Sequence, residues 1–94
     1  MKEYKYITEW ADLAFPDRED SFILLKMFEE IGEFVKHPHP WEAADIFILL
    51  IDICNRKGID LGKAVQEKMI VNMQRKWVVN KHTGVMQHVD EGKD

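Results

Sequence analysis

The chain has 94 residues, 46% hydrophobic and 11% aromatic, so we expect one folded domain over residues 1–94 rather than a disordered or multidomain chain. Thirteen lysines and arginines against seventeen acidic residues give a net charge of −4, which disfavours nucleic acid and membrane partners. The lone Cys54 excludes an internal disulfide or a cysteine-based zinc site and fits a reducing cytoplasm. We find neither a signal peptide nor the roughly 18 consecutive apolar residues of a membrane span.

The first two helices are predicted from apolar residues at helical spacing and from the prolines that follow them. The first covers about residues 3–14 and ends before Pro16. The second begins in an acidic segment rich in N-cap residues and runs to about Lys36. Pro38 and Pro40 end it, because a proline lacks the backbone N–H that a continuing helix needs.

The third helix, predicted over about residues 40–57, has an apolar middle. Pro40 suits its first position and Gly58 follows its basic last turn. The six apolar residues 46–51 make this helix hydrophobic all round, so it must be covered on every side. A chain of this length buries only roughly 60–65% of its unfolded surface. We therefore expect part of this helix to form the interface of a homo-oligomer, either a dimer or a tetramer.

The fourth helix is predicted over about residues 61–77. An apolar stripe at i,i+4 spacing is expected to face the core, and it consists of Leu61, Val65, Met69, Met73 and Trp77. Beyond it, the apolar segments 77–80 and 85–89 flank residues 81–84, which contain a glycine. This pattern predicts either a short hairpin or an extended tail.

Two acidic groups on neighbouring helices form the strongest candidate site. Glu29, Glu30 and Glu33 share one turn of the second helix, and Glu42 and Asp45 lie at i,i+3 in the third. The short connection makes the helices antiparallel neighbours, so four or five carboxylates can meet. Each group alone also fits a solvated face or acids that favour the helix dipole. Together they need a cation, and an all-oxygen set without helical Glu-x-x-His favours Mg²⁺, or Mn²⁺.

A second candidate group lies on the predicted fourth helix. Lys68, Asn72 and Arg75 occur at i, i+4 and i+7, which suits either the oxygens of a metal-bound polyphosphate or a solvated basic face. Asp52 follows Asp45 by seven residues and either adds to the acidic site or pairs with one of these cations. Three tryptophans are candidates for the core or for stacking on a base, namely Trp10, Trp41 and Trp77.

Taken in order, four motifs resemble the MazG-like nucleotide pyrophosphohydrolases over roughly residues 7–88. They are Glu29-Glu30-Ile31-Gly32-Glu33, Glu42-Ala43-Ala44-Asp45, Gly58-Ile59-Asp60-Leu61, and the spaced Lys68, Asn72, Arg75 and Trp77. The resemblance implies an all-α antiparallel bundle of about four helices, an oligomer. It also implies an Mg²⁺-dependent enzyme that splits nucleoside or deoxynucleoside triphosphates into monophosphate and pyrophosphate.

The resemblance also implies roles for single residues. The expected metal ligands are Glu30, Glu33, Glu42 and Asp45, with Glu29 as an outer acid or a water-orienting group. The expected substrate-binding residues are Lys68, Asn72 and Arg75 on the phosphate side, with Trp77 and Trp10 as candidates for stacking on the base. The opening and closing segments are most similar to short phage-borne or small bacterial members, which implies the cytoplasm of a bacterial or phage-infected cell. The alternative is a non-catalytic helical oligomerisation or interaction module with the same fold.

Overall fold

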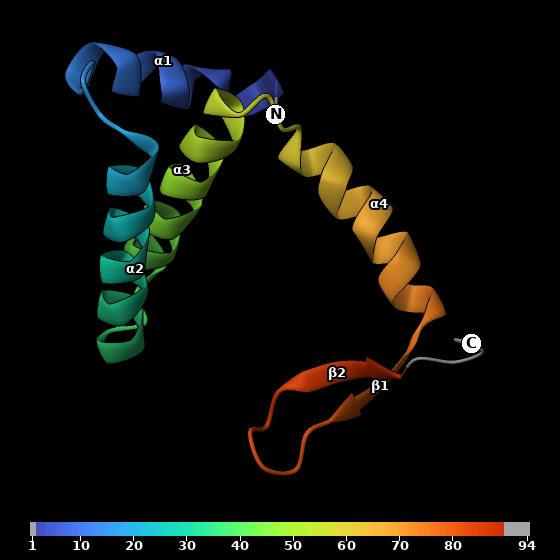
Figure 1. Ribbon diagram of the computed structural model, residues 1–94. Helices are drawn as coiled ribbons and strands as arrows, with labels where there is room; N and C mark the ends of the chain where they lie inside the picture. Colours follow the sequence, from blue (N-terminus) through green and yellow to red (C-terminus); the bar gives the residue numbers. More distant parts are fainter. Residues whose placement is uncertain (1, 90–94) are drawn as a thin grey trace. The chain divides into compact units, whose positions relative to one another are not determined.

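The computed structural model describes residues 2–89, and the chain forms two compact units, Met1–Gly62 and Lys63–Asp94. Along the chain (Figure 1) the elements are the 3-10 turn η1 (Lys2–Tyr4), α1 (Lys5–Ala14), α2 (Asp20–Lys36), α3 (Pro40–Arg56), α4 (Leu61–Gln74), β1 (Lys76–Val79) and β2 (Met86–Val89). The predicted all-α fold is confirmed, and the prediction of one domain over residues 1–94 stays a prediction. Within residues 2–89, every helix falls short of the length and apolar character that crossing a bilayer requires.

In the first unit, α2 and α3 lie side by side and antiparallel, and α1 runs across one end of the pair (Figure 1). The prolines produce the α2–α3 turn as expected, because Pro40 occupies the start of α3 and His39 caps it. The Trp41 backbone N–H donates to His39 Nδ1 at 3.1 Å. Asn55 Nδ2 of α3 donates to Thr8 Oγ1 at 3.0 Å, which ties α1 to α3.

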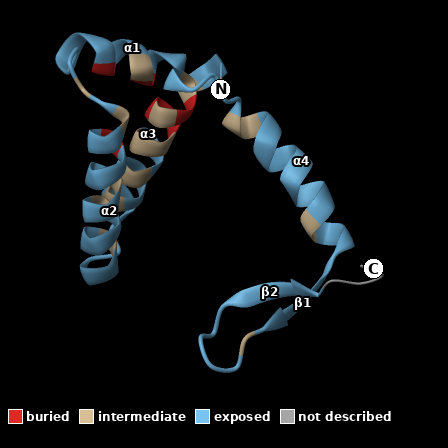
Figure 2. Cartoon of the chain, in the orientation of Figure 1, coloured by how far each residue is buried: buried red, intermediate tan, exposed pale blue. Residues whose placement is uncertain are grey.

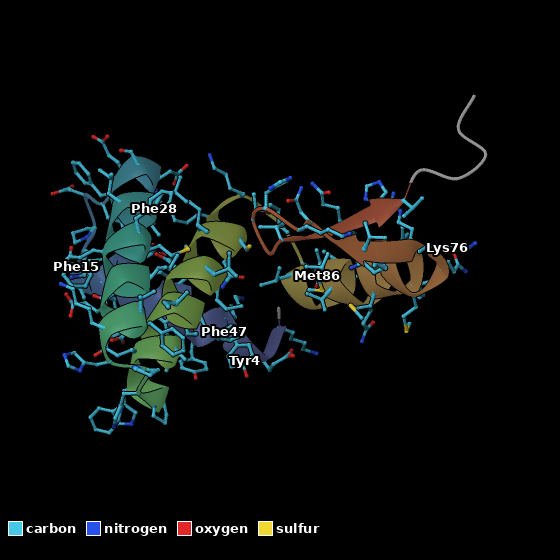
Figure 3. The ribbon with its side chains drawn as sticks, turned by 90° about the horizontal axis from the view of Figure 1, so that it is seen from below. Tyr4, Phe15, Phe28, Phe47, Lys76 and Met86 are labelled. Atoms are coloured by element: carbon cyan, nitrogen blue, oxygen red, sulfur yellow. The ribbon has the colours of Figure 1, made fainter. Side chains whose placement is uncertain are left out.

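The buried core of this unit lies where α1 meets the other two helices (Figure 2). It consists of Ile7 and Ala11 of α1, Ile23 of α2, and Ile51 and Cys54 of α3. The burial of Cys54 with these apolar side chains assigns it to packing. At the η1 end, the rings of Tyr4 and Phe47 meet edge to face with centroids 5.3 Å apart (Figure 3).

Much of the apolar surface of α2 and α3 stays exposed in the single chain. Phe47 and Ile48 lie in the apolar middle of α3 and remain more than a third exposed. Leu25 and Phe28 of α2 are exposed to a larger extent. The helix that the sequence predicts to need cover on every side is therefore only partly covered by its own chain.

The second unit corrects the predicted end of the fourth helix. Helix α4 ends at Gln74 instead of about residue 77, and Trp77 belongs to strand β1. The reason is strand pairing: the aromatic and β-branched residues 77–79 favour a strand, and β2 pairs with them antiparallel. The apolar stripe of α4 is not buried within its own unit either, since Met73 is 71% exposed, so the core-facing prediction is wrong there.

The hairpin alternative for the C-terminal segment is confirmed. Strands β1 and β2 pair from Lys76 with Val89 to Val79 with Met86. Asn80 organises the connection, since its Oδ1 accepts from the backbone N–H groups of residues 82 and 83 at 2.8 and 3.0 Å. Gly84 has φ of +73°, a left-handed conformation that glycine adopts without a steric penalty.

Candidate metal centre and adjoining pocket

Three carboxylates converge between α2 and α3. Glu30 of α2 and Glu42 and Asp45 of α3 each offer one oxygen, and these oxygens all lie within 4.8 Å of one another. The i,i+3 spacing places Glu42 and Asp45 on one face of α3, and the antiparallel partner brings Glu30 opposite them. Oxygens on opposite sides of an octahedral Mg²⁺ ion lie about 4.2 Å apart. This all-oxygen set therefore fits a hard divalent cation after small side-chain rotations.

The pKa of Glu42 reflects the crowding of negative charge in this cluster. Partial burial, followed by the negative charge of Glu30 and a hydrogen bond with it, raises the pKa of Glu42, and Asp45 and Glu33 add to the effect. A divalent cation among these groups removes the conflict, because it compensates the charge that burial and mutual repulsion disfavour. Glu33 therefore acts on the cluster through its charge but contributes no oxygen to the converging set among the described residues. Its role as a ligand stays a prediction.

Lys26 bridges two of the acids that the sequence singles out. Its Nζ lies 3.2 Å from Glu30 Oε1 and 3.4 Å from Glu29 Oε1. These contacts raise the pKa of the Lys26 ammonium, that with Glu30 most. Glu29 thus lies on the outer side of the cluster, against Lys26 rather than among the converging oxygens. Sequence reasoning missed Lys26, although its i,i+3 and i,i+4 spacing to the acids was a usable signal.

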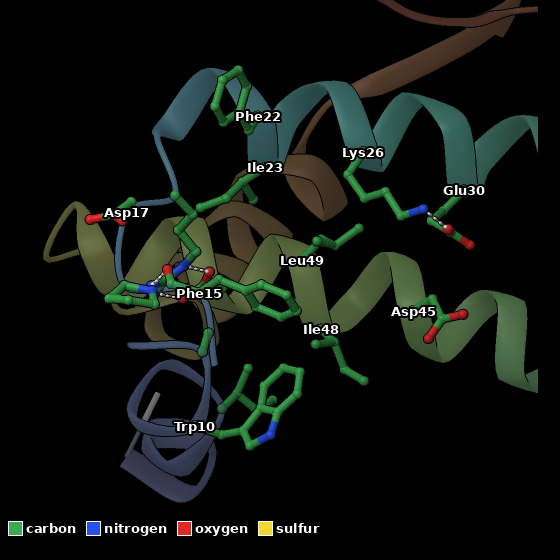
Figure 4. A pocket seen from close by; sticks show the side chains of 15 residues that line it. Trp10, Phe15, Asp17, Phe22, Ile23, Lys26, Glu30, Asp45, Ile48 and Leu49 are labelled. Atoms are coloured by element: carbon green, nitrogen blue, oxygen red, sulfur yellow. Dashed lines mark hydrogen bonds and ion pairs between the residues drawn. The ribbon is translucent and has the colours of Figure 1, made fainter. Parts of the chain in front are cut away.

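A pocket of about 740 Å³ adjoins the acidic cluster and lies between α1, α2 and α3. Its apolar wall includes Ile7, Trp10, Phe15, Phe22, Ile48 and Leu49. Glu30, Asp45 and Lys26 line another part of the same pocket, away from Trp10 and Phe15 (Figure 4). Trp10 is 57% exposed, and its ring meets that of Phe15 edge to face at 5.7 Å. A cavity of this size with a few polar groups suits a small-molecule ligand.

An ion pair fixes the wall of this pocket. Arg18, in the α1–α2 connection, donates from Nε and Nη2 to the two carboxylate oxygens of Asp52 at 2.8 and 2.9 Å. It also donates to Asp12 Oδ1 at 2.9 Å and to the Phe15 carbonyl at 3.2 Å. The Arg18 and Asp52 side chains are only 8% and 6% exposed. The hydrogen bond with Asp52 is the largest of the effects that hold the pKa of Arg18 above its usual range.

This pairing resolves the open position of Asp52. The sequence left it between the acidic site and one of the cations Lys68 and Arg75, whereas its partner in the structure is Arg18. The two residues are 34 positions apart, so no helical spacing could have indicated the contact.

The predicted phosphate-side residues belong to the second unit. Lys68 and Asn72 lie on α4, but Arg75 follows its last residue, so the expected i, i+4, i+7 face does not extend to Arg75. The helix ends there because the chain enters strand β1. Trp77 Nε1 donates to the Asn72 carbonyl at 2.8 Å. A small recess of about 290 Å³ in this unit is lined by Met69, Asn72, Met73, Trp77 and Met86. Substrate binding by these residues stays a prediction.

Comparisons with known proteins find relatives of this chain over most of its length. Residues 4–94 match the family model described as dATP/dGTP pyrophosphohydrolase. The chain is 40% identical over 90 residues to a dATP/dGTP diphosphohydrolase of Salmonella phage PMBT28, covering 94% of this chain and 31% of that protein. It is 33% identical over 86 residues to the dATP/dGTP diphosphohydrolase of Cyanophage S-2L, covering 88% of this chain and 81% of that one.

A solved structure extends the likeness to the fold. The Cyanophage S-2L MazG-like pyrophosphohydrolase, bound to dGDP and three catalytic Mn²⁺ ions per active site, matches with a TM-score of 0.80 and 32% identity over 93% of each chain. The chain spans about a third of the Salmonella phage relative and most of the cyanophage one. The predicted MazG-like fold and the hydrolase class, acting on phosphoric anhydrides, are confirmed at the level of the family. The chain belongs to the dATP/dGTP pyrophosphohydrolase family.

Proposed function

We propose that this chain is a nucleoside triphosphate pyrophosphohydrolase that requires Mg²⁺, or Mn²⁺, and releases pyrophosphate and a monophosphate. The observation that carries the proposal is the convergence of the Glu30, Glu42 and Asp45 oxygens beside a pocket of about 740 Å³, which Glu30 and Asp45 also line. The purine deoxynucleotides dATP and dGTP are the first candidate substrates, since the family and both phage relatives carry these names. The solved relative that holds dGDP and Mn²⁺ supports the same ligand class.

Glu30, Glu42 and Asp45 are the proposed metal ligands, and Glu33 is a further ligand that reaches the site after rotation of its side chain. A bound divalent cation neutralises phosphate charge and lowers the pKa of an attacking water. Glu29 lies outside the converging oxygens and is the proposed acid that orients this water, once Lys26 no longer holds it. The carboxylates thus position the cation, and the helix pair fixes their spacing.

The apolar part of the pocket is the proposed site for the base. Trp10 and Phe15 present aromatic rings there, and apolar side chains of α2 and α3 complete the wall. Stacking on an aromatic ring contributes about 1–3 kcal/mol per base. The larger surface of a purine fills an apolar pocket of this volume better than a pyrimidine does, which fits the names of the relatives.

Lys68, Asn72 and Arg75 remain proposed phosphate-side residues, and Trp77 a proposed base-side residue. Their support is the order of the motifs in the sequence and the positive charge of two of them. Replacing Lys68 and Arg75 with glutamine tests the proposal, and we expect a higher KM for the triphosphate with unchanged Mn²⁺ affinity. Unchanged KM in the double variant would contradict it.

We also propose a homo-oligomer, a dimer or a tetramer, acting in the cytoplasm of a phage-infected cell. The exposed apolar side chains of α2 and α3, among them Leu25, Phe28 and Phe47, are the support for the oligomer. The phage origin of both relatives supports the location. Light scattering after size-exclusion chromatography tests the assembly, and a monomeric mass at micromolar concentration would contradict it.

The activity is tested by product analysis with dATP, dGTP, dCTP, dTTP and the ribonucleotides, with Mg²⁺, Mn²⁺ or EDTA. We expect pyrophosphate and monophosphate with either metal and neither product with EDTA. Glu42→Gln and Asp45→Asn remove metal ligands and should abolish turnover. Glu9→Gln, which changes an exposed carboxylate of α1, is the matched control and should keep full activity. A folded protein that turns over no nucleotide would favour the non-catalytic interaction module.

A further inference from the structure

The pocket contains few positive charges for a ligand that carries several negative ones. Among the described residues that line it, the cationic side chains are Arg18 and Lys26. Arg18 is 8% exposed and its guanidinium already makes four hydrogen bonds to Asp52, Asp12 and the Phe15 carbonyl. Lys26 has a side chain that is 53% exposed. Lys26 is therefore the pocket cation whose head group can turn toward a ligand.

The present partners of Lys26 are one acid of the candidate metal centre, Glu30, and its neighbour Glu29. The Lys26 Nζ lies 3.2 Å from Glu30, which is one of the three converging carboxylates (Figure 4). The same Nζ lies 3.4 Å from Glu29. A divalent cation held by Glu30 would compete with the Lys26 ammonium for that carboxylate and would repel the ammonium. The flexible four-carbon stem of a lysine allows the head group to move away at little cost.

We infer that Lys26 is a phosphate-binding residue that the divalent cation releases for the substrate. Before the metal binds, the Lys26 ammonium pairs with the Glu30 carboxylate and compensates its negative charge. With metal in place, the ammonium turns to the phosphate oxygens of a nucleotide in the pocket. The inference rests on the proposed function and deepens it, because it makes binding of the metal and of the triphosphate cooperative through one side chain.

Lys26 competes with the metal for Glu30 but assists the binding of phosphate. Removing its charge should therefore have opposite effects on the affinities for Mn²⁺ and for nucleotide. In Lys26→Gln, Mn²⁺ loses a competitor for Glu30, so its affinity without nucleotide should rise about two- to fivefold. The affinity for a non-hydrolysable α,β-methylene dGTP in the presence of Mn²⁺ should fall about 10- to 100-fold, as expected for a lost charge-assisted hydrogen bond. Lys26→Arg keeps the charge and should retain nucleotide binding within about threefold.

The experiment is calorimetric titration of the whole chain, first with Mn²⁺ alone and then with the analogue at saturating Mn²⁺. Lys5→Gln is the matched control, since Lys5 also forms an i,i+4 pair, with Glu9 on α1, but does not line the pocket. Opposite shifts in Lys26→Gln and none in Lys5→Gln are the expected result. If Lys26→Gln leaves the affinities for Mn²⁺ and for the analogue unchanged, or lowers both equally, the inference is overturned. The proposed function still stands in that case, provided that the wild type binds the analogue. A wild type that binds Mn²⁺ but no analogue would overturn both.

Discussion

Replacing Asp52 with asparagine should destabilise the fold strongly although Asp52 lies outside the converging carboxylates. Asp52 and Arg18 are more than nine-tenths buried and share two hydrogen bonds of 2.8 and 2.9 Å. Asparagine leaves the Arg18 charge in the protein without its main counter-charge, and breaking a buried pair in this way costs about 3–5 kcal/mol. We expect the lower end, about 3 kcal/mol, because Asp12 and the Phe15 carbonyl remain as partners of Arg18.

A loss of that size lowers the midpoint of thermal unfolding by roughly 12–24 °C for a chain of this length. The assay is thermal and urea unfolding followed by circular dichroism. The matched control is Asp20→Asn, which removes the pairing of Asp20, at the start of α2, with Arg56 and Lys57 at the end of α3. Asp20 is a third exposed, so its shift should be several-fold smaller. Equal shifts for the two variants, or no shift in Asp52→Asn, would refute the argument from burial.

Three further predictions follow from the acidic cluster and the pocket. Because burial, first among several causes, raises the pKa of Glu42, a proton competes with Mn²⁺ for this carboxylate at higher pH than for an ordinary glutamate. Mn²⁺ affinity should therefore fall as the pH drops through that raised pKa. The metal-free fold should instead gain stability over the same window, because folding favours protonated Glu42. Calorimetry in several buffers measures both effects, and an identical pH profile in Glu42→Gln would contradict them. Mn²⁺ at a hundredfold excess over its dissociation constant should stabilise the wild type against unfolding by about 2.7 kcal/mol. Asp45→Asn should lose most of this stabilisation, which thermal unfolding with and without Mn²⁺ measures. If Mn²⁺ stabilises Asp45→Asn as much as the wild type, Asp45 is not a metal ligand. Trp10→Ala should raise the KM for dGTP about tenfold or more and leave the Mn²⁺ affinity unchanged. Trp41 is exposed and lies outside the pocket, so the control Trp41→Ala should leave the KM unchanged. Equal KM values for the two variants would contradict the proposed base site.

The helices of the first unit were predictable because local signals decide their ends. Pro16, Pro38 and Pro40 interrupt the backbone hydrogen bonding, and helices α1 to α3 end or begin within a few residues of them. The end of α4 was not predictable in this way. The apolar period continues to Trp77, but pairing with β2 takes that residue into a strand, and tertiary pairing overrides helical period.

The candidate site likewise combines contacts that local spacing predicts with contacts that only tertiary packing produces. Glu42 and Asp45 share a helix face by spacing, and a short turn brings Glu30 to them, so their convergence followed from the sequence. The contact of Arg18 with Asp52 joins a connection to a helix across 34 residues, and only the packing of α1 and α2 on α3 brings the two together. In the sequence, the i,i+4 spacing of Lys26 and Glu30 is typical of an ordinary solvent-exposed ion pair. Only the structure shows that both residues line a pocket.

The central claim is that Glu30, Glu42 and Asp45 hold the divalent cations that bind a triphosphate in the adjoining pocket. A crystal structure with Mn²⁺ and α,β-methylene dGTP, with anomalous scattering used to locate the metal, tests it most directly. We predict a Mn²⁺ peak within about 2.3 Å of oxygens from these three residues, phosphates on the metal and the base against Trp10. A Mn²⁺ peak away from all three carboxylates, or a nucleotide outside the pocket, would contradict the account.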